Sequence, residues 1–176
     1  MGEDGETMRM LRGLDGSPRE RLAERISAAS YGTVLVLAAL TLIDLDDVAD
    51  GLGWELVTGV GVATWMAHLY AEVVGDHVRH TAAVARKEAT RAMGDGLPIL
   101  LATVLPAVML LLGRLDVLAA RVALWASIGL AILQLVSVGG FVGFVVSHRG
   151  PTAWLYAATT AALGLVVVTV KLVLGH

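Results

Sequence analysis

Apolar residues in this chain gather into long blocks that short charged stretches separate. Each block holds about 17 to 26 residues, and a helix needs about 20 apolar residues to cross the roughly 30 Å hydrocarbon core of a bilayer. The pattern therefore predicts an all-α fold, a polytopic integral membrane helix bundle with about five transmembrane helices. The predicted spans are residues 26–43, 54–74, 97–113, 122–147 and 152–174.

A polar segment precedes the first block. Ser17 and Pro18 stand where a helix would take its N-cap and its first residue, and both residue types are favoured there. We expect a flexible tail that passes into an amphipathic lead-in, so that residues 1–25 precede one membrane domain over residues 26–176. Because the first apolar run begins only after this long polar segment, a secretory signal peptide is not expected.

Two of the polar segments between the blocks have a distinct character. Residues 44–50 contain Asp44, Asp46, Asp47 and Asp50 and predict an acidic loop. Such a loop could concentrate cations at an entrance or could simply be solvated. Residues 75–96 are polar but rich in helix formers, and we expect them to extend the second span or its neighbour into water.

Composition narrows the class of protein. Hydrophobic residues make up 56% of the chain and charged residues 16%, whereas a soluble domain is about half apolar and a quarter charged. The chain has no cysteine, so a disulfide framework or a thiolate metal site is excluded. No Gly-rich phosphate loop, nucleophile elbow or catalytic dyad is visible. We expect no enzyme activity and no cofactor, and scattered basic residues suit anionic lipid better than nucleic acid.

The distribution of basic residues predicts the orientation. Of the 13 lysines and arginines, ten fall on one side of a five-span arrangement and three on the other. Cytoplasmic segments carry the excess of basic residues. We therefore expect a cytoplasmic N-terminus and an outside C-terminus, in the plasma (inner) membrane. The basic residues on the outer side are Arg114, Arg121 and Lys171.

The second predicted span carries a stripe of ionisable residues. They recur every four positions and so share one helix face: His68, Glu72, Asp76 and His80. Ionisable groups within a membrane cost about 2.5–3.5 kcal/mol each and commonly mark a pathway or a partner. The stripe fits a proton relay, a hard-metal site or a pore mouth. Alternatively, His68 bonds to a neighbouring helix while the other three reach cytoplasmic water; whether a metal binds stays open.

The fourth predicted span carries small and polar residues near its middle. Gly139 and Gly143 form a GxxxG pair, which lets helices approach closely. Gln134 and Ser137 precede them. Helix packing explains this group, and a role for Gln134 in a permeation path is the alternative.

The first predicted span resembles the first helix of the lysosomal and prokaryotic potassium channel family called transmembrane protein 175. That family's signature, R-x-x-x-F-S-D-G followed by an aliphatic helix ending in aspartate, is matched without a gap at Arg25, Ser30, Gly32 and Asp44. Further short matches occur at Trp65 to His68, at Leu105-Pro106 and at Leu112-Gly113. The Phe and Asp of the signature are Ala29 and Tyr31 here, and the family repeat has six spans.

The resemblance implies a homo-oligomer whose first helices line a central ion path closed by aliphatic rings. The matching positions are Val36, Leu40 and Ile43, whose spacing places them on one helix face. Such rings gate a pore by excluding water. We therefore predict an oligomeric, channel-like membrane protein that conducts monovalent cations. One alternative is a proton-coupled carrier of a metal or small cation that uses the His68 stripe. Another is a non-transporting membrane partner protein.

Overall fold

The computed structural model describes residues 18–79, 93–94 and 96–147, and single positions between 155 and 173. The described residues form helices and no strand. The helices are α2 (Pro18–Thr41), α3 (Leu45–Asp50), α4 (Leu52–Arg79), α6 (Leu97–Arg114) and α7 (Ala120–Ser147). The all-α prediction is confirmed for this part of the chain.

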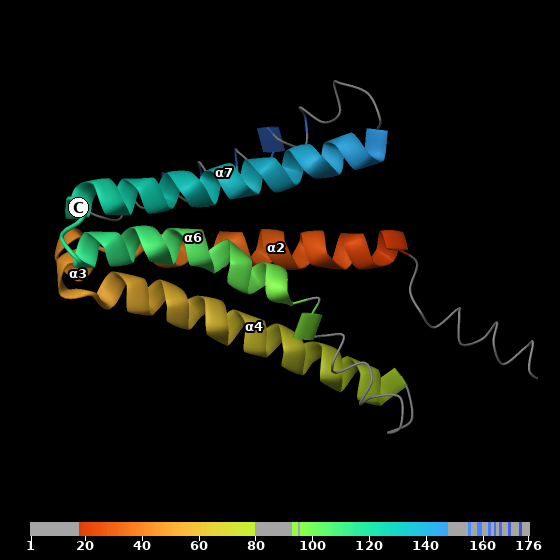
Figure 1. The fold of residues 1–176 in the computed structure, drawn as a ribbon. Coiled ribbons are helices and arrows are strands. Elements are labelled where there is room, and N and C mark those ends of the chain that lie inside the picture. Colours follow the sequence, from red (N-terminus) through yellow and green to blue (C-terminus); the bar gives the residue numbers. More distant parts are fainter. Residues whose placement is uncertain are drawn as a thin grey trace, which may run out of the picture.

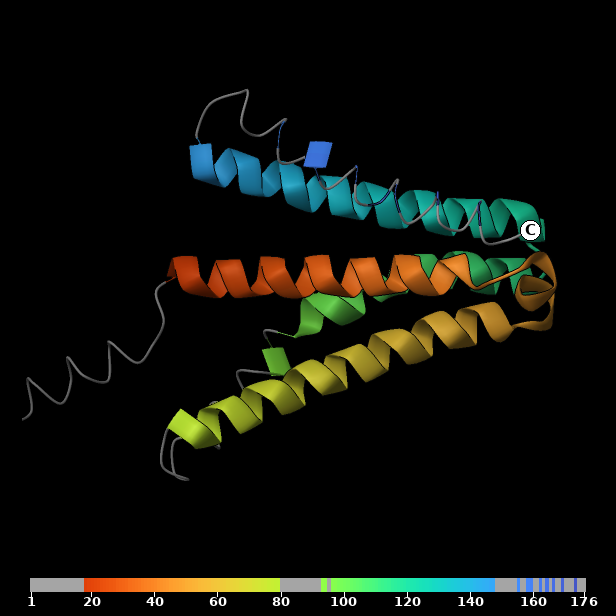
Figure 2. The ribbon, with the colours of Figure 1, turned by 180° about the vertical axis from the view of Figure 1, so that it is seen from behind.

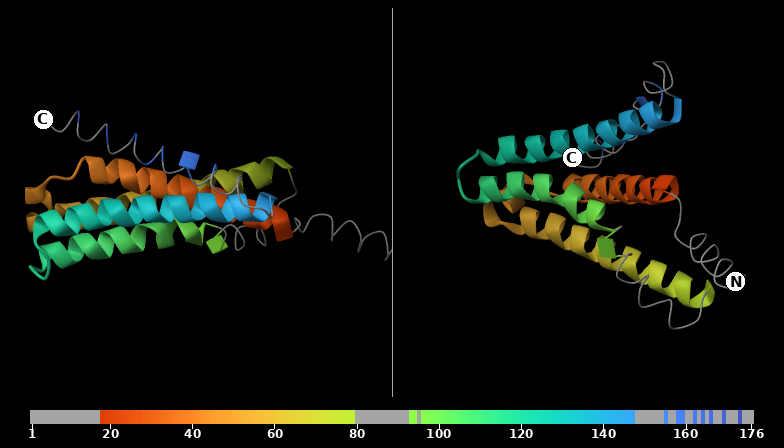
Figure 3. Two further views of the ribbon diagram at one scale, coloured as in Figure 1. Left: turned by 90° about the horizontal axis from the view of Figure 1, so that it is seen from above. Right: turned by 45° about the vertical axis from the view of Figure 1, so that its right-hand side comes forward.

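The four long helices form a bundle with α2 and α6 at its centre. Both central helices contact α4 on one side and α7 on the other, and they contact each other. Figure 1 shows α4 and α7 on opposite sides of this central pair. The two outer helices lie closest at the α3 end and diverge towards the other end, as Figures 2 and 3 show from further directions. The bundle therefore has a closed end at α3 and a splayed end.

The acidic stretch after the first span folds as helix α3, so the prediction of a loop over residues 44–50 was wrong. The backbone N–H of Asp44 donates to Asp47 Oδ2 at 2.8 Å, as in one half of a capping box. Carboxylates in a first helical turn are also favoured by the helix dipole. Gly51 ends α3 with a φ of 91°, a left-handed conformation that glycine adopts without strain.

The long helices agree with four predicted spans within a few residues at most ends. The lead-in and the first span are one continuous helix, α2, which begins at Pro18. Helix α4 continues past the predicted end of span two as far as Arg79. The fifth predicted span, 152–174, lies mostly outside the described residues. Within it Gly164 is buried, and a Cβ there would lie 3.5 Å from Ile132 Cγ1 on α7.

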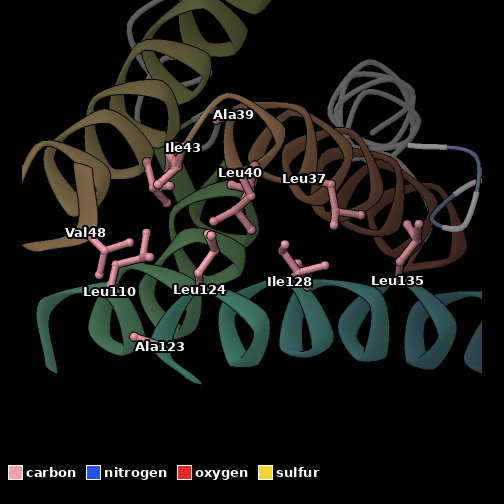
Figure 4. Close-up of a cluster of buried hydrophobic side chains, with 13 residues drawn as sticks. Leu37, Ala39, Leu40, Ile43, Val48, Leu110, Ala123, Leu124, Ile128 and Leu135 are labelled. Atoms are coloured by element: carbon pink, nitrogen blue, oxygen red, sulfur yellow. The ribbon is translucent and has the colours of Figure 1, made fainter. Parts of the chain in front are cut away.

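The core occupies the closed end and the middle of the bundle. Its buried residues come from α2, α3, α4, α6, α7 and the segment between α2 and α3, and they are aliphatic throughout (Figure 4). They are Val36, Leu37, Ala39, Leu40, Ile43, Val48, Val57, Leu110, Ala123, Leu124, Ile128, Ala131 and Leu135. Burial of such side chains stabilises a fold by about 1.5–3 kcal/mol each for valine, leucine and isoleucine.

Two of the described helices are long and apolar enough to cross a membrane, judged by length and composition. They are Leu97–Arg114 and Ala120–Phe144. Helices α2 and α4 are longer than α6, but their charged and polar residues keep them outside this criterion. These apolar helices suggest that the protein associates with a membrane.

Candidate functional site

Two members of the predicted polar stripe contact each other on α4. His68 Nε2 lies 3.0 Å from Glu72 Oε1, and the side chains are 27% and 29% exposed. The i, i+4 spacing places both on one face of the helix, which is why the contact forms without help from another element. An imidazole and a carboxylate at this distance can share and exchange a proton.

A cavity of about 430 Å³ opens beside this pair, between α2 and α4. Its described lining is Tyr31, Ala63, Thr64, Ala67, His68 and Ala71. The three alanines are small, so the two helices leave space where larger side chains would fill it. Tyr31 from α2 and His68 from α4 bring polar groups to this otherwise largely apolar wall. His68 therefore borders a space large enough for several water molecules.

The beginning of α6 rests against the same part of α4. A Cβ on Gly96 would lie 2.9 Å from Trp65 Cδ1 and 3.3 Å from His68 Cδ2, so only glycine fits there without movement. Trp65 Nε1 is buried and has no hydrogen-bond partner among the described residues. Nothing in the sequence pattern pairs Gly96 with Trp65. The one available signal is that Gly96 lacks a side chain and directly precedes Leu97-Pro98, where a helix starts.

The structure describes the backbone position of one further member of the stripe. Asp76 follows one turn later on α4, and His80 lies outside the described residues. Within the part of the chain that the structure describes, no group of three His, Cys, Asp or Glu side chains could hold a metal ion. The described geometry thus shows the His68–Glu72 pair. The hard-metal interpretation, which also needs Asp76 and His80, stays a prediction.

The aliphatic positions predicted to line a pore lie in the core of the single chain. Val36 and Ile43 are 1% exposed and Leu40 is 0% exposed, and all three belong to the buried cluster shared with α6 and α7 (Figure 4). A residue that lines an axis between copies must face away from its own core. In this packing the three residues face other helices of the same chain, and their role as pore lining stays a prediction.

The signature-like residues of α2 have structural contacts of their own. Gly32 is buried, and a Cβ there would lie 3.1 Å from the Ile99 backbone on α6. Ser30 Oγ donates to the Ile26 carbonyl one turn back, at 2.8 Å. Arg25 is exposed near the start of the helix, and Asp44 is exposed at the start of α3. Gly32 therefore allows α2 and α6 to approach closely, whereas Ser30 lies mid-helix and bonds within α2.

The glycine pair on α7 lies on a buried face. Gly139 and Gly143 are both buried, whereas Gly140 has open space where a Cβ would be. The predicted role of these glycines in helix packing requires that they be buried. Which helix packs against them stays a prediction. Gln134 Oε1 is buried without a hydrogen-bond partner among the described residues. Ser137 is exposed and donates to the Leu133 carbonyl within α7.

Comparison of the chain with protein-family models, with curated proteins and with solved structures finds no match. The function must therefore be argued from the chain's own geometry. The feature that combines ionisable chemistry with an adjoining space is the His68–Glu72 pair.

Proposed function

We propose that this protein is an integral membrane protein that moves protons, alone or coupled to another small cation, through the region of His68 and Glu72. The observation that carries the proposal is the 3.0 Å contact between His68 Nε2 and Glu72 Oε1 beside a cavity of about 430 Å³. Histidine is the side chain whose charge ordinarily changes between pH 5 and 8. A carboxylate within hydrogen-bonding distance can accept and return the imidazole proton.

The depth that we expect for the pair in a membrane supports this proposal. At a rise of about 1.5 Å per residue, His68 lies about 20 Å along α4 from Trp54. With Trp54 at the outer surface, His68 falls within a hydrocarbon core of about 30 Å. Ionisable side chains at such depth cost about 2.5–3.5 kcal/mol each, so they are usually retained for a function. Large apolar side chains on α4 are exposed, including Val62, Met66 and Tyr70, as a lipid-facing surface requires.

The proposed arrangement has about five spans with a cytoplasmic N-terminus, in the inner membrane. The apolar helices α6 and α7 and the excess of basic residues on one side support it. The splayed end of the bundle, where α2 begins and α7 ends, is then cytoplasmic (Figure 1). The cavity beside His68 lies near the middle of α2 and α4.

A channel lined by the aliphatic face of α2 is less compatible with this packing. Val36, Leu40 and Ile43 would have to leave the core before an ion could pass between copies of α2. The family resemblance implies such a channel, whereas the aliphatic residues lie here in the buried cluster of the single chain. We therefore place the proposed path at the α2–α4 cavity and keep homo-oligomer formation as a separate expectation.

Proton flux in liposomes tests the proposal. Purified protein is reconstituted with potassium inside, valinomycin is added to make the interior negative, and internal pH is followed with a trapped dye. We expect the interior to acidify faster than in protein-free liposomes. His68→Ala and Glu72→Gln should each reduce the rate to the protein-free level. Glu55→Gln is the matched control, because Glu55 is an exposed carboxylate in the first turn of the same helix.

Two results would contradict the proposal. One is parent protein that acidifies the interior no faster than protein-free liposomes at equal lipid. The other is a His68→Ala variant with the parent's rate. In the first case a non-transporting membrane partner protein becomes the leading interpretation.

Topology is tested separately by labelling single cysteines, which the cysteine-free chain makes possible. A cysteine at Asp46, an exposed position on α3, should react with an impermeant reagent added outside intact cells. A cysteine at Ala85 should react only after the membrane is opened. The opposite pattern would show that the orientation is wrong.

A further inference from the structure

A second cavity lies on the other side of α2, where that helix faces α7. It has a volume of about 270 Å³ and lies near the start of α2 and the end of α7. Its described lining is Arg25, Ile26, Ala29, Ser137, Val138 and Phe141. This groove does not include His68 or Glu72, and nothing in the proposed proton path uses it.

The chemistry of the groove is divided between an apolar wall and one cation. Ile26, Val138 and Phe141 form most of the wall, whereas Arg25 is exposed. The hydroxyl of Ser137 already donates to the Leu133 carbonyl at 2.7 Å, so it does not need a ligand. The Arg25 guanidinium carries five N–H donors in a fork that matches phosphate, and Arg25 also has a contact within the chain.

The position of the groove indicates which molecule meets this chemistry. In the proposed orientation it opens at the cytoplasmic end of the bundle, where Arg25 is close to the membrane surface and Ile26 and Ala29 follow into the hydrocarbon. The cytoplasmic leaflet holds anionic lipids, and each basic residue near it contributes about 1 kcal/mol of attraction. A phospholipid matches this arrangement, because its phosphate lies at the membrane surface and its acyl chains lie in the hydrocarbon below.

We propose that this groove binds one anionic phospholipid, with the phosphate at Arg25 and an acyl chain along Ala29, Val138 and Phe141. The proposal rests on the proposed membrane placement and is independent of proton transport. An inorganic phosphate ion would use Arg25 but not the apolar wall. A zwitterionic lipid would use the wall but would gain less from Arg25, because its own cationic group offsets the phosphate charge.

Lipid binding to the purified full-length protein in detergent tests this proposal. Native mass spectrometry measures the bound fraction of phosphatidylglycerol and of phosphatidylcholine at equal concentrations. Inorganic phosphate is added as a competitor, to test whether the site recognises the headgroup phosphate alone. We expect phosphatidylglycerol to be preferred and phosphate not to compete with it. Arg25→Gln should reduce the preference about fivefold, as the loss of one surface cation predicts, and Arg25→Lys should retain most of it.

Two further variants separate the groove from general surface charge. Val138→Trp adds bulk to the apolar wall and keeps Arg25, so it should reduce binding of both lipids. Arg121→Gln removes an exposed arginine from the opposite end of α7 and should leave the preference unchanged.

Each contrary outcome overturns the proposal. Equal binding of the two lipids by the parent protein removes the charge recognition. A preference that survives both Arg25→Gln and Val138→Trp places the lipid elsewhere. If Arg121→Gln lowers the preference for phosphatidylglycerol as much as Arg25→Gln does, the preference reflects the overall charge of the protein. If inorganic phosphate competes with phosphatidylglycerol, the site recognises the headgroup phosphate only. Absence of proton flux in liposomes would contradict the proposed transport and leave this lipid site untouched.

Discussion

Gly61 on α4 lies directly against Thr103 on α6. A Cβ at Gly61 would lie 2.8 Å from the Thr103 Cβ and closer still to its hydroxyl. Thr103 cannot easily turn away, because its Oγ1 donates to the Ile99 carbonyl at 2.9 Å and the side chain is buried. The absence of a side chain at Gly61 therefore sets how closely α4 and α6 approach.

This contact predicts that Gly61→Ala destabilises the fold. Overpacking of a close contact costs about 1–3 kcal/mol, and the free energy of unfolding in mixed detergent micelles measures it. Gly59→Ala is the matched control, since nothing lies within 4 Å of a Cβ at Gly59. There the alanine should be neutral or stabilise α4 by up to about 1 kcal/mol, because alanine is the better helix former. Equal effects at the two glycines would show that the α4–α6 contact is looser than described.

The role of Leu40 gives the second prediction. Leu40→Ala should lower the free energy of unfolding by about 2–5 kcal/mol, because Leu40 is fully buried in the core. Leu42→Ala should cost far less, since Leu42 is 73% exposed. A pore-lining Leu40 would behave differently: Leu40→Ser would raise cation flux in liposomes and leave stability nearly unchanged. That result would restore the aliphatic face of α2 as a conduction path.

Ser127 links α7 to α6 and gives the third prediction. Its Oγ lies 3.0 Å from the Pro106 carbonyl oxygen on α6 and 2.8 Å from the Ala123 carbonyl oxygen one turn back. Ser127→Ala should cost about 0.5–1.5 kcal/mol, the usual net value of a hydrogen bond, measured by the same unfolding assay. Ser137→Ala is the control, because Ser137 is exposed and bonds within its own helix. A Ser127→Ala variant as stable as the parent would show that the link between the helices is not stabilising.

Gln134 gives the fourth prediction. A buried acceptor without a donor costs about 1–3 kcal/mol, so Gln134→Leu should raise the free energy of unfolding. Gln134→Glu should lower it, because a carboxylate would be buried at the same place. Proton flux measured on the leucine variant tests the alternative role. Loss of flux together with higher stability would assign Gln134 to the transport path rather than to packing.

The approximate bounds of the long helices could be predicted from the sequence, because apolar blocks of about 20 residues favour long helices over other structures. Helix α3 was not predicted, since the four aspartates in residues 44–50 favour solvent and indicated a loop. The Asp47 side chain that accepts from the Asp44 N–H turns this stretch into a helix. Short-range capping of this kind depends on backbone geometry that a polarity pattern does not contain.

The His68–Glu72 contact could also be predicted, because residues four apart on a helix are neighbours whatever surrounds them. The site around the pair could not. Tyr31 and Gly96 reach it from α2 and from the start of α6, and no spacing along the chain relates them to His68.

The sequence by itself determined the helical class, the approximate bounds of the long helices and the i, i+4 pair on α4. These features depend on local periodicity and on the length of apolar runs. The tertiary structure alone decided which face of α2 is buried. Val36 and Leu40 share a face of α2, and Ile43 follows shortly after its end. Such an aliphatic surface suits a dry pore, a lipid surface and a protein core equally well. Packing against α6 and α7 selects the core, because only contacts between distant segments distinguish these environments.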